Sequence, residues 1–427
     1  MPLPARWYPL EPHPEQVRLV QSTARWKVVA AGRRSGKTER AKRKLVEAAL
    51  DPPKVPTPTF IAAAPTRDQA KRIWWDDLKA LSPRQWVSAI SESELTIHYK
   101  TGSRLMVVGM DRPQRVEGIP IDGCVIDEID ECKRSAWSSS LRPALSTRGR
   151  PGWCWFIGRP KGRALLYDLW TNAKSTPDWD AFHWTSSDII GAAEVEAAKR
   201  DLDPRMFAQE YEAAFLTASG RVYYAFDTAV HVQPVRYEPT LPLVFCFDFN
   251  VAPGSAVVVQ EQTLGPKVIT AVIGEVHIAD DSRTDLVCDE LARMYRGHTG
   301  DVAIYGDPSG NQRRTSAQSN DWDLVRQHLR KTFPRILDRV TRSAPPIVDS
   351  VNSVNARLLN AAGDVRFAIN AQAAPQTLKD LESVTWNEDK DTRDIDKSDP
   401  KRTHWSDALR YYIHERHPIG GSSMRIT

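Results

Sequence analysis

The segment VVAAGRRSGKT, residues 28–38, constrains the fold of this chain more than any other feature. An apolar strand runs into a turn that contains two glycines, and a helix-forming stretch follows from about residue 36 to 50. Backbone N–H groups in such a turn, and at the start of the helix behind it, bind phosphate groups. The segment therefore predicts an α/β domain with a phosphate loop after its first strand.

The loop predicts a binding site for ATP with Mg²⁺. Its expected ATP-binding residues are Gly32, Ser35, Gly36, Lys37 and Thr38. Lys37 would reach the β- and γ-phosphates as a catalytic residue, and the Thr38 hydroxyl would hold magnesium. The first glycine of the usual pattern falls at position 31, where this chain has Ala31, and the glycine comes one residue later. The alternative is a chance Gly-Lys-Thr at the start of a basic helix.

A second motif, CVIDEID, ends an apolar strand in Asp127 and Glu128. Downstream of a phosphate loop, Asp127 would complete the ATP site by holding magnesium through water. Glu128 would act as the catalytic general base that polarises the attacking water. The alternative is an ordinary acidic turn after a strand.

Three further residues near the loop have two interpretations each. Arg33 and Arg34 lie inside the loop, and are either solvated charges or catalytic contacts to the γ-phosphate in the same chain. Gln16, ahead of the first strand, is either a surface residue or part of the ATP site through a contact with adenine.

The second half of the chain carries a different set of acidic residues. Asp248 lies in the aromatic strand FCFDFN, Asp307 ends the strand DVAIYGD, and Asp407 lies on the amphipathic helix HWSDALRYY. Burying an aspartate among aromatic residues is costly unless a cation compensates it. Together the three carboxylates would hold two Mg²⁺ or Mn²⁺ ions for phosphodiester cleavage. Basic segments at 311–316, 326–331 and 399–405 favour nucleic acid as the substrate.

Length and charge bound these interpretations. With 427 residues, about two domains are expected. We assign a first domain to residues 1–225, with a linker region at about 165–240, a second domain to residues 241–417, and a flexible tail to 418–427. A net charge of +4 permits a nucleic-acid partner without requiring one. No apolar run approaches the roughly 20 residues of a membrane helix, so no membrane partner is expected.

The motifs and their order resemble the large terminase subunit of tailed bacteriophages. The resemblance spans roughly residues 14 to 415 and rests on AGRRSGKT, AAAPTRDQA, RVEGIPIDGCVIDEID, FAQEYEAAFLTASGRVY, FDFN, YGDPSG and HWSDALRYY. It implies an N-terminal P-loop ATPase domain, with a parallel sheet flanked by helices. A C-terminal RNase H-like nuclease domain with a mixed sheet would follow. ATP hydrolysis would drive double-stranded DNA into a procapsid, and the nuclease would cut concatemeric DNA.

The resemblance also implies residues and partners. A catalytic arginine supplied by a neighbouring subunit would fall on Arg142 or Arg148. The expected partners are double-stranded DNA, the portal protein of the procapsid and a small terminase subunit. A homo-oligomeric ring is expected on the portal, with a monomer as the alternative for the isolated chain. The chain would act in the host cytoplasm and transiently at the portal vertex, and would be absent from the mature virion.

Two positions depart from the family pattern: the displaced glycine, and Arg159-Pro160 where the family's coupling segment usually has threonine before proline. Two rival functions remain open. One is a helicase-like ATPase fused to a repair nuclease, which would unwind duplex DNA. The other is a portal-docking subunit with a vestigial nuclease, which would bind metal weakly and cut no DNA.

Overall fold

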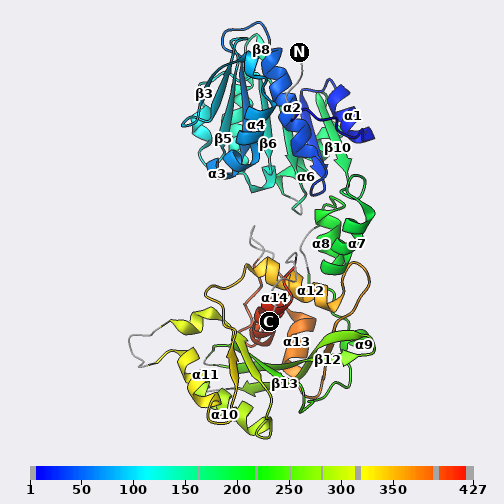
Figure 1. Ribbon diagram of the computed structural model, residues 1–427, viewed down its shortest axis with the longest axis vertical. Helices are drawn as coiled ribbons and strands as arrows, with labels where there is room; N and C mark the ends of the chain where they lie inside the picture. The colour runs from blue at the N-terminus through cyan, green and yellow to red at the C-terminus, as the bar shows by residue number, and fades with distance from the viewer. Residues whose placement is uncertain are drawn as a thin grey trace. The chain divides into compact units, whose positions relative to one another are not determined.

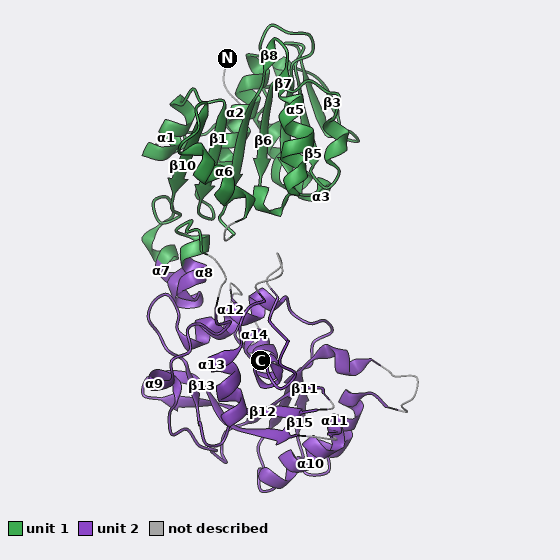
Figure 2. Ribbon diagram, turned by 180° about the vertical axis from the view of Figure 1, so that it is seen from behind, with its two compact units in different colours: residues 1–195, 208–217 green, residues 196–207, 218–427 purple. Residues whose placement is uncertain are grey.

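A computed structural model describes residues 6–161, 164–216, 220–250, 252–279, 282–312, 319–387 and 394–419. The chain forms two compact units, residues 1–195 with 208–217, and residues 196–207 with 218–427 (Figures 1 and 2). The sequence places the change of domain between residues 225 and 241, whereas the contacts place it between 195 and 218. Residues 420–427 of the expected tail lie outside the described residues.

An eight-stranded sheet forms the centre of the first unit, in the order β10-β1-β9-β6-β2-β5-β4-β3. Its strands are β1 (Trp26–Ala31), β2 (Thr59–Ala64), β3 (Val87–Ser91), β4 (Thr96–Tyr99), β5 (Arg104–Gly109), β6 (Gly123–Asp127), β9 (Trp153–Gly158) and β10 (Trp179–Trp184). From β10 to β5 all neighbours run parallel. Every residue of β1 and β2 is buried, as expected for central parallel strands.

Two parts of this sheet differ from the sequence pattern. The strands β5, β4 and β3 run antiparallel, because a short turn joins β4 to β5 and cannot make the crossover of a parallel pair. The strand β10 pairs with β1 at the other edge, inside the range expected as linker. Its sequence, WDAFHW, mixes polar with aromatic residues and lacks the continuous apolar run of the central strands.

Helical segments cover both faces of this sheet (Figure 1). They are α1 (Pro14–Gln21), α2 (Lys37–Leu50), α3 (Arg67–Ala70), the π-helical η1 (Lys71–Trp75), α4 (Asp76–Leu81), the 3-10 turns η2 (Arg84–Trp86), η3 (Pro113–Val116) and η4 (Ile129–Glu131), the π-helical η5 (Ala136–Leu141), α5 (Arg142–Ala144) and α6 (Leu165–Ala173). A two-stranded hairpin, β7 (Ser146–Thr147) with β8 (Arg150–Pro151), follows α5. On one face α2, η1 and α4 share a core with β1 and β2, and on the other face η5 and α6 do so.

A six-stranded mixed sheet forms the second unit, in the order β15-β14-β11-β12-β13-β16. Its strands are β11 (Leu243–Asp248), β12 (Gly254–Leu264), β13 (Lys267–Ile278), β14 (Val302–Gly306), β15 (Ile336–Asp338) and β16 (Phe367–Ile369). The first three form an antiparallel meander, and β14, β15 and β16 add in parallel.

Helices also cover both faces of the second sheet. They are α9 (Thr228–His231), α10 (Thr284–Met294), η6 (Pro308–Asn311), α11 (Asp321–Leu329), α12 (Ile347–Leu358), α13 (Pro375–Ser383) and α14 (His404–Arg416). The core of one face includes α12, α13 and α14, and the core of the other includes α10 and α11. Two more helices, α7 (Ala192–Asp201) and α8 (Pro204–Glu210), contain two of the three points at which the chain changes unit.

Two tryptophans of the first unit give a matched test of its core. Trp74 is 0% exposed and donates a hydrogen bond from its indole to the Ala63 carbonyl, whereas Trp86 is 45% exposed. Trp74→Ala should lower the free energy of unfolding by about 3–5 kcal/mol through the lost burial and the cavity it leaves. Trp86→Ala should change it by only about 0.5 kcal/mol. Urea denaturation followed by circular dichroism measures both, and equal losses would contradict this description of the core.

Candidate functional sites

The loop between β1 and α2 has the backbone geometry of a phosphate-binding turn. Arg34 and Gly36 both have positive φ angles, 56° and 81°, and Gly36 is the residue immediately before α2. Inside the loop, the Ser35 hydroxyl donates to the Gly32 carbonyl at 2.6 Å and the Lys37 ammonium donates to the same carbonyl at 3.4 Å. The N–H groups of the first turn of α2 therefore face the loop and can donate hydrogen bonds to a bound anion.

The displaced glycine has a steric cause. A Cβ atom on Gly32 would lie 2.3 Å from the Ser186 hydroxyl, 2.7 Å from the Ser186 nitrogen and 2.5 Å from the Tyr211 carbonyl oxygen. Ala31, in contrast, is the fully buried last residue of β1, where a methyl group is accommodated. The glycine is thus needed at the position where two other backbone segments approach the loop.

Thr38 and Asp127 meet across the loop, although 89 residues separate them in sequence. The Thr38 hydroxyl donates to Oδ2 of Asp127 at 2.8 Å, and the Glu128 N–H donates to Oδ1 at 2.9 Å. Burial raises the pKa of Asp127, and the nearby charge of Lys37 opposes this shift. A buried carboxylate beside a hydroxyl is a pair of hard oxygen donors, so these residues fit Mg²⁺.

Glu128 has an uncommon backbone and an incompletely bonded side chain. Its φ and ψ, 52° and 48°, lie in the left-handed region, which is rare for residues other than glycine. Its Oε2 is buried, and no described residue makes a hydrogen bond to it. Burial raises the pKa of Glu128, and the neighbouring charge of Asp127 raises it further. A carboxylate of this kind, at the edge where the phosphate loop lies, can accept a proton from water.

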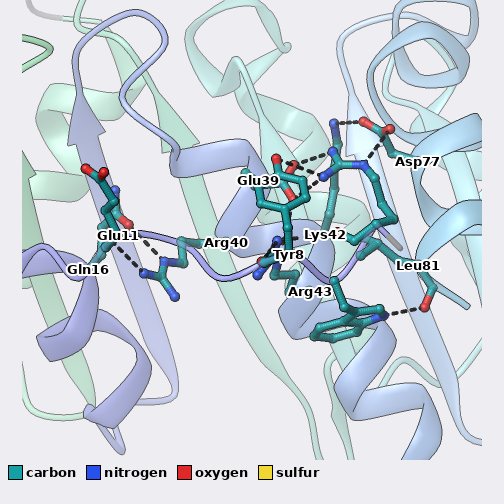
Figure 3. A network of polar contacts seen from close by, with 11 residues as sticks. Tyr8, Glu11, Gln16, Glu39, Arg40, Lys42, Arg43, Asp77 and Leu81 are labelled. Atoms are coloured by element: carbon teal, nitrogen blue, oxygen red, sulfur yellow. Dashed lines mark hydrogen bonds and ion pairs between the residues drawn. The ribbon is translucent and has the colours of Figure 1, made fainter. Parts of the chain in front are cut away.

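Gln16 contacts the phosphate loop through its side chain. It is 3% exposed, and its amide nitrogen donates to the Ser35 carbonyl at 2.8 Å. Its amide oxygen accepts from the Arg40 guanidinium at 2.8 Å, as Figure 3 shows. Both ends of the side chain are therefore bonded, and the contact with adenine stays a prediction.

Residues 6–8 add a support for α2 that the sequence analysis missed (Figure 3). The Arg6 guanidinium donates to Glu39 at 2.7 Å and to Asp77 at 3.2 Å, and Asp77 also accepts from Lys42 at 2.6 Å. The Trp7 indole donates to the Leu81 carbonyl at 2.6 Å. These contacts connect α2 to α4 through charges that look like solvated surface residues in the sequence.

Three of the four candidate arginines, Arg33, Arg34 and Arg142, lie in two different places. Arg33 and Arg34 are exposed on the loop, and the Arg33 guanidinium is 3.9 Å from Oε2 of Glu210. The Arg142 guanidinium lies 4.7 Å from the ring centroid of Trp26, the first residue of β1, whereas the loop follows the last residue of that strand. Arg142 is therefore at the opposite edge of the sheet from the loop of its own chain. The action of Arg142 on the site of a neighbouring chain stays a prediction.

The second unit brings the three predicted aspartates near one another. The register of β11 and β14 pairs Phe247 with Gly306, so that the next residues, Asp248 and Asp307, are neighbours. Asp407 lies in the first turn of α14. Burial raises the pKa of Asp248, and the charges of Asp407 and Asp307 raise it further, while His404 opposes them. Three mutually repelling carboxylates are a donor set that suits hard divalent cations.

Cations of the protein pair with these carboxylates. Oδ2 of Asp248 lies 3.1 Å from Nδ1 of His404, and Asp407 accepts from Lys397 at 2.8 Å and from Arg410 at 2.7 Å. Burial tends to raise the pKa of Asp407, but Arg410 and Lys397 outweigh it and the pKa is lowered. In the described ranges, no three His, Cys, Asp or Glu side chains are arranged to hold a metal ion. The metal-ligand role of the aspartates remains a prediction.

The expected basic segments also form internal ion pairs. Arg326 pairs with Asp323 and Asp338, and Arg402 pairs with Asp380. Residues 313–316 of the first basic segment lie outside the described residues. None of the helices in the described ranges has both the length and the apolarity of a membrane span.

Residues 28–229 match the family model of the terminase large subunit, T4likevirus-type, N-terminal. The large terminase subunit of Thermus phage G20c is 27% identical over 256 residues, which cover 52% of this chain and 52% of the relative. The corresponding subunit of Escherichia phage T5 is 24% identical over 189 residues, covering 42% of each. The chain therefore matches about half the length of these curated relatives.

Solved structures show the same fold over the whole chain. The large terminase of a thermophilic bacteriophage matches with a TM-score of 0.59 and 17% identity, covering 97% of this chain and 99% of that chain. The same phage protein in complex with ATP-gamma-S matches with a TM-score of 0.56 and 18% identity, covering 97% of this chain and 99% of that chain. The predicted fold class, an α/β chain with a largely parallel-sheet domain followed by a mixed-sheet domain, is confirmed.

The steric role of Gly32 can be tested against its neighbour. Gly32→Ala should cost about 1–3 kcal/mol of folding free energy, because backbone atoms of residues 186 and 211 must move. It should also weaken binding of a fluorescent ATP analogue. Ala31→Gly should cost about 0.5–1 kcal/mol and keep the loop's contacts. Thermal unfolding and fluorescence titration measure these effects, and a Gly32→Ala protein as stable as Ala31→Gly would refute the explanation.

Proposed function

Because the chain belongs to the large terminase family through its residues 28–229, we propose that it is the motor and nuclease of viral DNA packaging. ATP hydrolysis in the first unit would drive double-stranded DNA into a procapsid, and the second unit would cut concatemeric DNA. The observation that carries the proposal is the hydrogen bond from the Thr38 hydroxyl at the phosphate loop to Asp127, whose other carboxylate oxygen accepts the Glu128 N–H. On the same chain, Asp248, Asp307 and Asp407 are expected to form a separate site.

The proposed hydrolysis assigns one task to each residue of the loop site. Lys37 and the first turn of α2 would bind the phosphates, and Gly32 lets the loop pack closely enough to do so. Thr38 and Asp127 would hold Mg²⁺, which would neutralise phosphate charge when bound. Glu128 would accept the proton of the attacking water. Arg33 or Arg34 in the same chain, and Arg142 from a neighbour, remain candidates for the charge that forms on the γ-phosphate.

The proposed nuclease rests on Asp248, Asp307 and Asp407. They would hold two divalent cations, Mg²⁺ or Mn²⁺, which would activate water and stabilise the leaving oxygen. For a cation to bind, Lys397 and His404 must release the carboxylates they now contact. We extend the proposal to a homo-oligomeric ring at the portal protein, a small terminase subunit as partner, and action in the host cytoplasm.

Two substitutions separate the activities. Lys37→Ala should reduce ATP hydrolysis by at least about 100-fold, because the phosphates lose their main cation, and should spare DNA cleavage. Asp307→Ala should do the reverse. Phosphate release and cleavage of plasmid DNA with Mn²⁺ or Mg²⁺ measure the two activities on the full chain. Cleavage that survives Asp307→Ala would refute the aspartate site.

Two further results would favour the rival functions. Strand displacement by the intact chain would favour a helicase-like ATPase, because a packaging motor should move duplex DNA without unwinding it. Weak metal binding with no cleavage by the unmodified chain would favour a portal-docking subunit with a vestigial nuclease.

A further inference from the structure

Arg159 lies between two carboxylates of the first unit. It follows β9, and its Nε is 3.6 Å from Oε2 of Glu128. Its Nη1 donates a hydrogen bond to Oε2 of Glu210, the last residue of α8. The side chains of Arg159, Glu128 and Glu210 are 21%, 23% and 8% exposed, so this ion pair is largely shielded from solvent. One guanidinium therefore pairs with two carboxylates from different segments.

Glu210 is in turn attached to the phosphate loop. Its main-chain carbonyl accepts the Arg33 N–H at 2.7 Å, and the adjacent carbonyl of Tyr211 accepts the Ser186 N–H at 2.6 Å. The Ser186 hydroxyl also donates to the Arg33 carbonyl at 2.5 Å. The side chain that holds Arg159 is thus fixed to the same loop that is expected to bind the phosphates.

The carboxylate of Glu128 depends on Arg159 more than Glu210 does. Its Oε2 is buried and receives no hydrogen bond from the described residues, and its charged neighbours include Asp127, Lys37, Arg159 and Lys161. Among these, Arg159 forms the ion pair with Oε2. A buried carboxylate without such a partner is strongly destabilised as the anion. A planar guanidinium offers Nε and Nη1 to two carboxylates in a fixed fork geometry, whereas an ammonium is a compact charge without that fixed orientation.

We propose that Arg159 is a positioning residue for Glu128. Anchored by Glu210, its guanidinium holds the Glu128 carboxylate at the phosphate-loop edge, oriented to accept the proton of water. The inference rests on the proposed ATPase function and adds to it a connection from the loop through Glu210 to the base. It also gives a role to the position at which the chain departs from the usual coupling segment.

The test compares steady-state ATP hydrolysis by variants of the full chain. Arg159→Ala should lower kcat by about 10- to 100-fold, because a base displaced by about 1 Å loses catalytic efficiency. The KM for ATP should change by less than about 2-fold, because Arg159 is not expected to contact the bound phosphates. Arg159→Lys should recover part of kcat by restoring the charge. Glu210→Gln should lower kcat less than Arg159→Ala does.

The double variant gives the sharper result. If Glu210 acts through Arg159, Arg159→Ala with Glu210→Gln should be no slower than Arg159→Ala alone. Arg134→Ala is the matched control, since Arg134 pairs only with Asp168 among the described residues, and both side chains are exposed. It should leave kcat unchanged. Thermal unfolding of each variant checks its fold, and Arg159→Lys tests the proposal if the alanine variant unfolds.

Failure of the positioning role can be distinguished from failure of the proposed ATPase function. No ATP hydrolysis by the unmodified chain, or hydrolysis that survives Lys37→Ala, would overturn the ATPase and the role of Arg159 with it. Hydrolysis that requires Lys37 but keeps its kcat in Arg159→Ala would overturn the positioning role alone. A rise in KM without loss of kcat, or additive losses in the double variant, would also overturn it.

Discussion

The carboxyl ends of the parallel strands β1, β6 and β9 meet at one edge of the first sheet, and the candidate ATP site depends on this constraint. The phosphate loop follows β1, Asp127 ends β6, and Arg159 comes directly after β9. None of these segments is near another in sequence. Parallel pairing places the ends of these strands side by side in the sheet. The Thr38 hydroxyl and Asp127, 89 residues apart in sequence, therefore form a 2.8 Å hydrogen bond.

Local patterns in the sequence were sufficient to predict the elements that meet at this edge. The loop, α2 and the acidic end of β6 each carry their signal within about ten residues, through glycines, an apolar strand and a helix start. The supports of the loop have no such signal. Gln16, Trp184 and Glu210 reach it from three other segments, and their contacts depend on packing that only the folded chain defines. The strand β10 was not predicted for the same reason. It has the mixed composition of an edge strand and pairs with β1, about 150 residues earlier in the sequence.

The second unit repeats the constraint with a different result. The neighbouring ends of β11 and β14 bring Asp248 and Asp307 together, and packing of α14 against the same face of the sheet adds Asp407. The positions of the aspartates, on two apolar strands and an amphipathic helix, were enough to expect this convergence. The partners of the aspartates could not be expected in the same way, because Lys397 and His404 come from the region just before and at the start of α14. Their sequence has the composition of an ordinary polar loop.

Burial makes each group of carboxylates costly, and the two units offset the cost differently. In the first unit the Arg159 guanidinium pairs with both Glu128 and Glu210. Oε2 of Glu128 receives no hydrogen bond from the described residues. In the second unit Asp407 pairs with two cations, Lys397 and Arg410. Arg410 is 6% exposed at its side chain and is also bonded to Ser350, whereas the Lys397 side chain is 60% exposed. Because an exposed ion pair contributes little and an ammonium regains its hydration on leaving, Lys397 is the partner that a divalent cation would displace, and Arg410 would remain.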